Sequence, residues 1–227
     1  DDNSETRESL KALRCAHFVA TLLGVEELPQ GGNPMDAIKR FAESYIPDLS
    51  GVASFRVRCT RFGNHSFRSV DVERTVGEVI HESTGVPGKM RGAACVVRAD
   101  VIVRKIVFAV QIHSEELSKR LHPEFIRDAA IKPNVAAAML QFAEFGPNEV
   151  LLDPFVGSGT IAIEAAIKFP SSSVIGIDKS ERVLAGARAN AESLQVHVDL
   201  RVANARNLCK IVERGTVDRI VTNPPWG

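Results

Sequence analysis

A carboxylate and two glycines stand close together in the segment Asp153-Pro154-Phe155-Val156-Gly157-Ser158-Gly159-Thr160. The glycines allow the backbone to approach a ligand closely, and Thr160 can begin a helix. The segment lacks the Gly-x-Gly-x-x-Gly spacing of a dinucleotide site, and its fixed carboxylate would repel a pyrophosphate. The same carboxylate would attract the positively charged aminoacyl end of S-adenosylmethionine in a partly dehydrated cleft. We therefore expect S-adenosylmethionine rather than NAD as the cofactor, bound by Asp153, Phe155, Gly157, Gly159 and Thr160.

Polar residues also follow the next two hydrophobic segments. Asp178 ends one of them, where its carboxylate can accept hydrogen bonds from both ribose hydroxyls of an adenosine cofactor. A structural role competes with this one, because Asp178 could instead cap the helix that begins near Ser180. After the following segment, the Asn204 amide could meet the adenine edge beside Ala205, or it could form an ordinary turn. We predict contacts with the adenosine part of the cofactor at Asp178, Asn204 and Ala205.

The tetrapeptide Asn223-Pro224-Pro225-Trp226 follows a fourth hydrophobic segment. Its two prolines hold the chain rigidly and remove backbone donors, so that acceptors face the cleft. Hydrogen bonds from an exocyclic amine to the Asn223 side-chain oxygen and the Pro224 carbonyl would favour an sp³-like, nucleophilic nitrogen. Trp226 could stack on the base and align it with a donor methyl group. Alone, the tetrapeptide is more typical of a rigid surface turn, but its place after a fourth strand favours a catalytic role.

These residues fall on a regular alternation of strands and helices in the C-terminal half. A helix is expected from Pro133 to Glu144. The pattern after it predicts strands at 150–153, 174–178, 197–202 and 217–222, with helices at 160–168 and 180–193 and a short helix before the last strand. Such an order is typical of a parallel, doubly wound, Rossmann-like α/β sheet. Ligands of these sheets bind at the carboxyl ends of the strands, where the polar residues above are found.

The N-terminal half has a different pattern. Apolar spacing predicts an amphipathic helix over Ser4–Leu23 that Gly24 ends, and a second helix from Pro34 to about Tyr45. Strict alternation over Ser54–Thr60 predicts a half-buried strand whose exposed face carries Arg56 and Arg58. A helix over 69–84 and strands over 94–103 and 106–112 follow, with a tight reversal at 104–105 and a short helix from about residue 114.

Charge and cysteine content narrow the class of protein. The net charge is zero, but residues 1–50 carry 5 basic and 9 acidic side chains, residues 51–132 carry 14 and 9, and residues 133–227 carry 9 and 10. Only the middle segment, at +5, is a candidate surface for a polyanion, although a mixed solvated surface explains it equally well. The four separated cysteines include no Cys-x-x-Cys pair, so we expect no metal site and a reducing compartment, the cytoplasm or alternatively the nucleus. No apolar run has the length of a membrane span, and the acidic N-terminus differs from a signal peptide, so a soluble protein is expected.

Three segments together resemble the THUMP-domain RNA methyltransferases, which are class I, S-adenosylmethionine-dependent enzymes. The segment from Asp153 to Ala166 and the Asn-Pro-Pro-Trp-Gly end resemble their catalytic domain, residues 132–140 resemble the helix before it, and residues 55–67 resemble the core of their THUMP domain. The resemblance implies methylation of guanine N2, most simply in tRNA, and an RNA-binding role for the middle segment. The residues expected to contact RNA are Arg56, Arg58, Arg61, His65 and Arg68, and the last three could instead be ordinary solvated loop residues.

The resemblance also predicts the domain organisation. We expect an N-terminal helical segment (1–50), a smaller α+β THUMP-like domain (51–120) and a methyltransferase domain (121–227). The sequence stops directly after the tetrapeptide, whereas the sheet of the family continues with three further strands. We therefore expect this domain to be C-terminally incomplete, truncated after its fourth strand, and the 227 residues alone to be unstable or inactive. A small activating subunit, as a further partner, is compatible with the sequence.

Other functions remain open. The tetrapeptide suits adenine N6 in DNA as well as guanine N2, and the RNA substrate could be rRNA or snRNA. A catalytically inactive RNA-binding protein would keep the fold but lose the cofactor contacts, and the intact Asp153, Asp178 and Asn223 argue against it.

Overall fold

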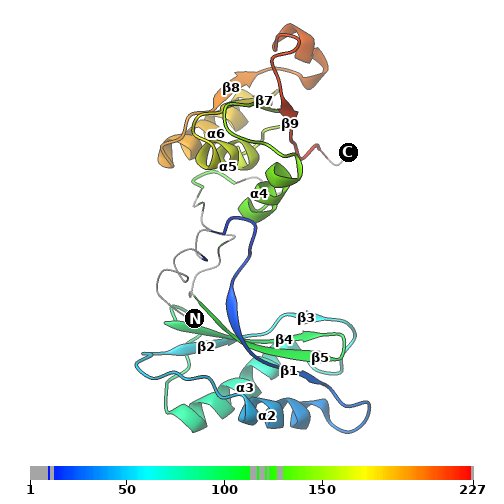
Figure 1. The fold of residues 1–227 in the computed structure, drawn as a ribbon, viewed down its shortest axis with the longest axis vertical. Coiled ribbons are helices and arrows are strands. Elements are labelled where there is room, and N and C mark those ends of the chain that lie inside the picture. The colour runs from blue at the N-terminus through cyan, green and yellow to red at the C-terminus, as the bar shows by residue number, and fades with distance from the viewer. Residues whose placement is uncertain are drawn as a thin grey trace. The chain divides into compact units, whose positions relative to one another are not determined.

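The computed structural model describes residues 10, 13–112, 117, 121, 123–126 and 130–225 (Figure 1). These residues form two compact units, one of residues 18–112 and one that contains residues 13–17, 123–126 and 130–225. The helix expected from residue 114, apart from Leu117, residues 4–9, 11 and 12 of the helix expected from Ser4, and Trp226 lie outside the described residues. In the part of the chain that the structure describes, no helix is long and apolar enough to cross a membrane.

The first unit is a five-stranded mixed sheet with two helices on one face (Figure 1). The sheet has the order β1-β5-β4-β2, and β3 also pairs with β4. Neighbours β1, β5 and β4 are antiparallel, whereas β2 and β3 run parallel to β4. The elements are β1 (Ala20–Glu27), α2 (Pro34–Ser44), β2 (Phe55–Arg58), β3 (Arg61–Phe62), α3 (Ser69–Thr84), β4 (Cys95–Ile102) and β5 (Lys105–Gln111).

Local sequence signals account for both helices. Asn33 caps α2 by accepting a hydrogen bond from the Met35 amide, and Pro34 takes the first helical position. The Asp71 carboxylate accepts from the Arg68 amide at the start of α3, and Gly85 ends that helix in a left-handed conformation. The apolar faces of both helices pack on alternate residues of β2 and β4 to form one core, which includes Ile38, Phe55, Val72, Val76, Val97 and Phe108. The expected helices at 34–45 and 69–84 are thus confirmed.

The N-terminal expectation is partly wrong. Residues 13–19 of the expected helix are not helical, and residues 20–23, predicted as its end, begin strand β1. Gly24 lies inside that strand instead of ending a helix. Pairing with the otherwise free edge of β5 outweighs helical spacing here, because the strand satisfies backbone groups of both segments. Gly24 is required because the Tyr45 ring lies directly over its Cα. Both β1 and α2 fall within the expected 1–50 segment, yet they pack in the same compact unit as β2–β5.

The reversal between β4 and β5 is displaced by one residue. It lies at Val103-Arg104, and Val103 has a φ of 55°, a conformation that β-branched residues rarely adopt. Neighbouring segments hold it in place, since the Val103 amide donates to the Phe62 carbonyl and the Leu28 amide donates to the Arg104 carbonyl. Contacts distant in sequence thus replace the Gly or Asn that a local turn would use.

The second unit contains a parallel four-stranded sheet in the order β8-β7-β6-β9. Its elements are α4 (Pro133–Phe142), β6 (Val150–Asp153), α5 (Thr160–Lys168), β7 (Ser173–Asp178), α6 (Glu181–Ser193), β8 (Asp199–Val202), the 3₁₀ helix η2 (Ala205–Lys210) and β9 (Arg219–Ile220). The chain progresses outward from β6 to β8 and then returns to place β9 on the other side of β6. The expected doubly wound α/β order is confirmed, and the reversal at β6 puts the carboxyl ends of β6 and β9 side by side.

Candidate active site

A cleft of about 790 Å³ opens at the carboxyl ends of the four parallel strands of the second unit. This is within the usual range for a small-molecule site. Ten of the residues expected to bind cofactor or substrate line it: Asp153, Phe155, Gly157, Thr160, Asp178, Asn204, Ala205, Asn223, Pro224 and Pro225. Trp226, the remaining predicted catalytic residue, lies outside the described residues.

The loop after β6 is held in a conformation that requires its glycines. Gly157 and Gly159 have φ values of 54° and 89°, in the left-handed region. Gly159 caps α5 without lining the cleft, and a Cβ at that position would lie 3.2 Å from Ile163 Cδ1. The Val156 amide donates to the Ile177 carbonyl, which fastens the loop to β7. Substitution of Gly159 would therefore strain the backbone and crowd the Ile163 side chain.

Asp153 is a buried carboxylate at the centre of this edge. It is 1% exposed. Its Oδ1 accepts hydrogen bonds from the Thr222 hydroxyl at 2.6 Å and from the Phe155 amide at 3.1 Å. Burial raises the pKa of Asp153 to about 6, against the opposing effect of these two donors, and the charge of Asp178 adds to the rise. At neutral pH the cleft therefore contains a desolvated negative charge.

The side chains of Asp178 and Asn204 both accept hydrogen bonds from backbone amides and also line the cleft. Asp178 Oδ1 accepts from the Ser180 amide at 3.0 Å, while Ser180 itself caps α6. Asn204 Oδ1 accepts from the Arg206 amide at 3.0 Å and caps η2. The turn role weighed for Asn204 is thus present, and the cap role weighed for Asp178 falls instead to Ser180. Both side chains nevertheless line the cleft.

The Asn223-Pro224-Pro225 segment leaves the sheet beside the Asp153 loop. The Val221 amide donates to the Leu152 carbonyl, which continues the pairing of β9 with β6 to the edge of the cleft. Asn223 is half-buried, and Pro224 and Pro225 are exposed. The cofactor-type loop and the amide-bearing tetrapeptide therefore meet at adjacent strand ends.

Two residues that support this site were not identified from the sequence. Thr222 bonds Asp153, as described above. Asn190 of α6 is fully buried and donates through Nδ2 to the carbonyls of Ser158 and Phe125, while its Oδ1 accepts from the Phe125 amide. Asn190 thereby ties the glycine loop to the segment 123–126. The only signal in the sequence was a polar residue on the apolar side of an alanine-rich helix.

The basic residues expected to bind RNA fall on the first unit, and Arg61, His65 and Arg68 have partners within the protein. The His65 Nε2 donates to the Val103 carbonyl at 2.6 Å, and its Nδ1 faces the Arg61 guanidinium at 3.2 Å. Both ring nitrogens are therefore engaged within the protein. Arg68 pairs with Asp71 at 3.4 Å but remains exposed. Arg56 and Arg58 lie on the face of β2 opposite the helices, and both are partly exposed.

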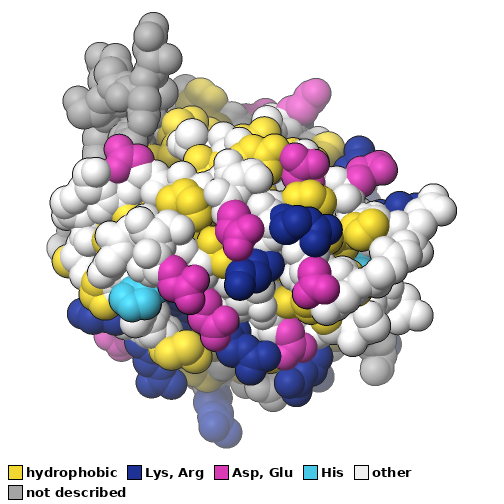
Figure 2. Space-filling model, turned by 90° about the horizontal axis from the view of Figure 1, so that it is seen from below, with side chains coloured by type: hydrophobic (Ala, Val, Ile, Leu, Met, Phe, Trp, Pro, Cys, Tyr) yellow, Lys and Arg dark blue, Asp and Glu magenta, His cyan; other side chains and the backbone are white. Residues whose placement is uncertain are grey.

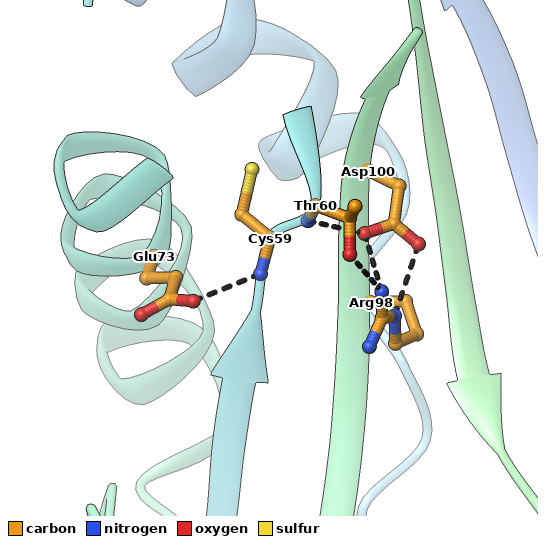
Figure 3. Close-up of polar contacts among 5 residues, drawn as sticks. All are labelled: Cys59, Thr60, Glu73, Arg98 and Asp100. Atoms are coloured by element: carbon orange, nitrogen blue, oxygen red, sulfur yellow. Dashed lines mark hydrogen bonds and ion pairs between the residues drawn. The ribbon is translucent and has the colours of Figure 1, made fainter. Parts of the chain in front are cut away.

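A polar network around the buried Arg98 holds the loop that follows Arg58 (Figure 3). The Arg98 guanidinium pairs with Asp100 and donates to the Thr60 hydroxyl, and the Thr60 amide donates to Asp100. From the other side, Glu73 of α3 accepts from the Cys59 amide. These bonds satisfy the amides of Cys59 and Thr60, the two residues between β2 and β3, both of which pair with β4.

The face of the first unit that carries α2 and α3 gives less support for RNA binding. Seen from the side of α2 and α3, acidic and basic side chains intermingle on the described part of the surface (Figure 2). No patch of a single charge sign covers that part of the face. The candidate polyanion-binding surface is therefore limited to the face that carries Arg56 and Arg58.

Among the described residues, no three metal-ligating side chains converge. All four cysteines are free.

Family models and relatives agree with this geometry. Residues 35–111 match the THUMP domain, and residues 119–227 match UPF0020, the RMKL-like methyltransferase domain. The tRNA (guanine(6)-N2)-methyltransferase of Thermus thermophilus is 39% identical over 97% of this chain and 65% of its own length, and that of Methanocaldococcus jannaschii is 28% identical over 77% and 57%. The crystal structure of TrmN from Thermus thermophilus has a TM-score of 0.77 at 36% identity, covering 99% of this chain and 66% of that one.

The fold and the cleft define a class I methyltransferase with a Rossmann-like sheet. With its THUMP domain preceding a UPF0020 methyltransferase domain, the chain belongs to the THUMP-domain RNA methyltransferases. The chain spans about two thirds, or less, of the length of the relatives that it matches.

Proposed function

We propose that this protein transfers a methyl group from S-adenosylmethionine to the exocyclic N2 of a guanine in tRNA. The observation that carries the proposal is the meeting of Asp153 and Asn223 at adjacent strand ends, on the lining of one cleft. One residue is a desolvated anion suited to a cationic cofactor, and the other is a neutral amide suited to an amine. Neither a covalent intermediate nor a metal ion is needed for this chemistry.

The residues of the cleft fit S-adenosylmethionine. Both hydrogen bonds that Asp153 accepts from described residues go to its Oδ1, so its Oδ2 can accept from the ammonium group of the cofactor. The glycine loop lets the backbone lie close to the methionine portion, and Asp178 and Asn204 are placed for ribose and adenine. When bound, the cofactor supplies an electrophilic methyl group held on a sulfonium.

The transfer step depends on the amine acceptors of Asn223 and Pro224. The side-chain oxygen of Asn223 and the carbonyl of Pro224 would accept the N–H groups of guanine N2 and direct the nitrogen lone pair toward the methyl group. As the N–CH3 bond formed, the S–CH3 bond would break, S-adenosylhomocysteine would leave, and the nitrogen would lose one proton to water. The two prolines keep these acceptors in place before substrate arrives, so the gain is largely one of positioning. A stacking role for Trp226 belongs to the same proposal.

The tRNA substrate is proposed from two lines of support. Relatives that match nearly the whole chain are named as tRNA guanine-N2 methyltransferases. Arg56 and Arg58 supply a partly exposed basic face on the THUMP unit, suited to phosphate contacts. Arg68, exposed at the start of α3, stays a proposed RNA contact, and we assign Arg61 and His65 to holding their own loop.

The decisive test uses the full-length protein, methyl-labelled S-adenosylmethionine and total cellular RNA. The RNA is digested to nucleosides, and labelled products are identified by mass spectrometry. Labelled N2-methylguanosine from the tRNA fraction is the expected result. Label in rRNA or snRNA would change the substrate, and N6-methyladenine formed on DNA in a parallel reaction would change the class of reaction.

An activating subunit and the cellular location belong to the same proposal. Activity that appears only after a cell extract is added would indicate the small activating subunit that the sequence allows. The four free cysteines suit a reducing compartment, and the cytoplasm is the proposed location.

A further inference from the structure

The hydroxyl of Thr222 has a specific partner that the proposed reaction does not yet use. Thr222 immediately precedes Asn223, and its Oγ1 lies 2.6 Å from Oδ1 of Asp153, 69 residues earlier in the chain. A carboxylate oxygen only accepts, so the threonine donates. The distance is that of a strong hydrogen bond to a charged acceptor. This bond joins the proposed cofactor anion to the strand that bears the proposed amine acceptor.

The arrangement around the carboxylate is asymmetric. Thr222 and the Phe155 amide both donate to Oδ1, whereas Oδ2 receives no hydrogen bond from described residues. The side chain is almost fully buried, so few alternative donors can reach it. The two donors therefore favour the charged form of Asp153 and turn its other oxygen toward the cleft.

The electrostatic surroundings make this hydroxyl consequential. Burial and the negative charge of Asp178 both raise the pKa of Asp153, to about 6, while the Thr222 and Phe155 donors lower it. Lys179 and Arg206 also line the cleft and contribute positive charge. Because the resulting pKa is close to neutral pH, removal of one donor brings protonation into the range in which the protein works.

We propose that Thr222 is a positioning residue that keeps Asp153 ionised for the cofactor's ammonium group. The proposal rests on the proposed function, because it takes S-adenosylmethionine as the ligand. Thr222 touches neither reacting atom, and its effect passes through Asp153. Its place one residue before Asn223 means that the cofactor site and the amine acceptor are fixed by the same short segment.

The test is the pH dependence of S-adenosylhomocysteine binding, measured by titration calorimetry from pH 5.5 to 8.5. It compares the full-length wild-type protein with Thr222→Val, which removes the hydroxyl at nearly constant volume, and with Thr222→Ser, which retains it. Loss of one hydrogen bond to the charged carboxylate should raise the pKa of Asp153 by about one unit. Thr222→Val should therefore bind about fivefold more weakly than wild type at pH 6 and within about twofold at pH 8. Thr222→Ser should follow the wild-type profile.

Several outcomes separate the inference from the function on which it rests. Parallel profiles for wild type and Thr222→Val, or an equal loss at every pH, would overturn the role of Thr222 while leaving the cofactor in place. Failure of wild type to bind at any pH would overturn the proposed function itself. Asp153→Asn should not bind S-adenosylhomocysteine measurably at any pH in this range, because the carboxylate that holds the ammonium group is gone. If Thr222→Val does not fold, Thr222→Ala also lacks the hydroxyl and gives the same comparison.

Discussion

Replacement of Asp153 by asparagine should stabilise the protein while it abolishes cofactor binding. The substitution keeps an acceptor oxygen for the Thr222 hydroxyl and the Phe155 amide, and it changes the volume little. What it removes is a charge in a side chain that is 1% exposed. Since an isolated buried charge is unfavourable, Asp153 lowers the stability of the fold while it provides the charge that binds the ligand.

The size and the sign of the effect follow from the titration of Asp153. Its pKa is raised from 3.8 to about 6 in the folded state, so folding favours the protonated form. The penalty for the ionised form is absent below about pH 3.8, grows between pH 3.8 and 6, and is complete above pH 6. A rise of about 2.2 pKa units corresponds to about 3 kcal/mol at pH 7.5, and the penalty falls to about 1 kcal/mol at pH 4.5.

Scanning calorimetry of the ligand-free protein measures this difference. At roughly 2–4 °C per kcal/mol for a chain of this size, Asp153→Asn should raise the Tm by roughly 6–12 °C at pH 7.5 and by far less at pH 4.5. Glu213→Gln, at an exposed position, serves as the matched control and should change the Tm little. A Tm that falls, or that rises equally at both pH values, would refute the assignment of a destabilising charge to Asp153.

Two other predictions address the support of the site and the RNA surface. Asn190→Leu should lower the free energy of unfolding by about 3 kcal/mol or more, since it leaves the Ser158 carbonyl and both backbone groups of Phe125 without partners; an unchanged denaturation midpoint would contradict this. The pair Arg56→Glu and Arg58→Glu should weaken tRNA binding and reduce the salt slope of log K by about 2 in filter binding, whereas Lys39→Glu with Arg40→Glu, exposed on α2, should not.

The sequence predicted the catalytic half well because its signals are local. The predicted polar residues Asp153, Asp178, Asn204 and Asn223 end a strand or follow one within three residues. The strand-helix alternation fixes which edge of the sheet they share. The helical spacing of apolar residues over 69–84 likewise gave the bounds of α3. Where composition, spacing and turn chemistry agree, the element forms as expected.

The failures arise where a distant partner decides the structure. Ala20–Leu23 have helical spacing, but the open edge of β5 makes them a strand. His65 was predicted to contact RNA, and nothing in the sequence indicated that its ring also faces Arg61 and bonds the Val103 carbonyl, 38 residues away. Thr222 shows the same limit, because nothing in its neighbourhood reveals that it donates to Asp153. Such pairings become visible only when the strands are assembled.

Single-turnover methyl transfer by Asn223→Ala tests the central claim most directly. The full-length variant is loaded with S-adenosylmethionine and mixed with tRNA that the wild-type protein methylates, and its affinity for S-adenosylhomocysteine is measured separately. We expect the rate to fall by about 100-fold or more, as when one oriented hydrogen-bonding group is removed from an active site, with the affinity unchanged within about twofold. Transfer to guanine N2 at a rate near that of wild type would contradict the assignment of Asn223 as the amine acceptor.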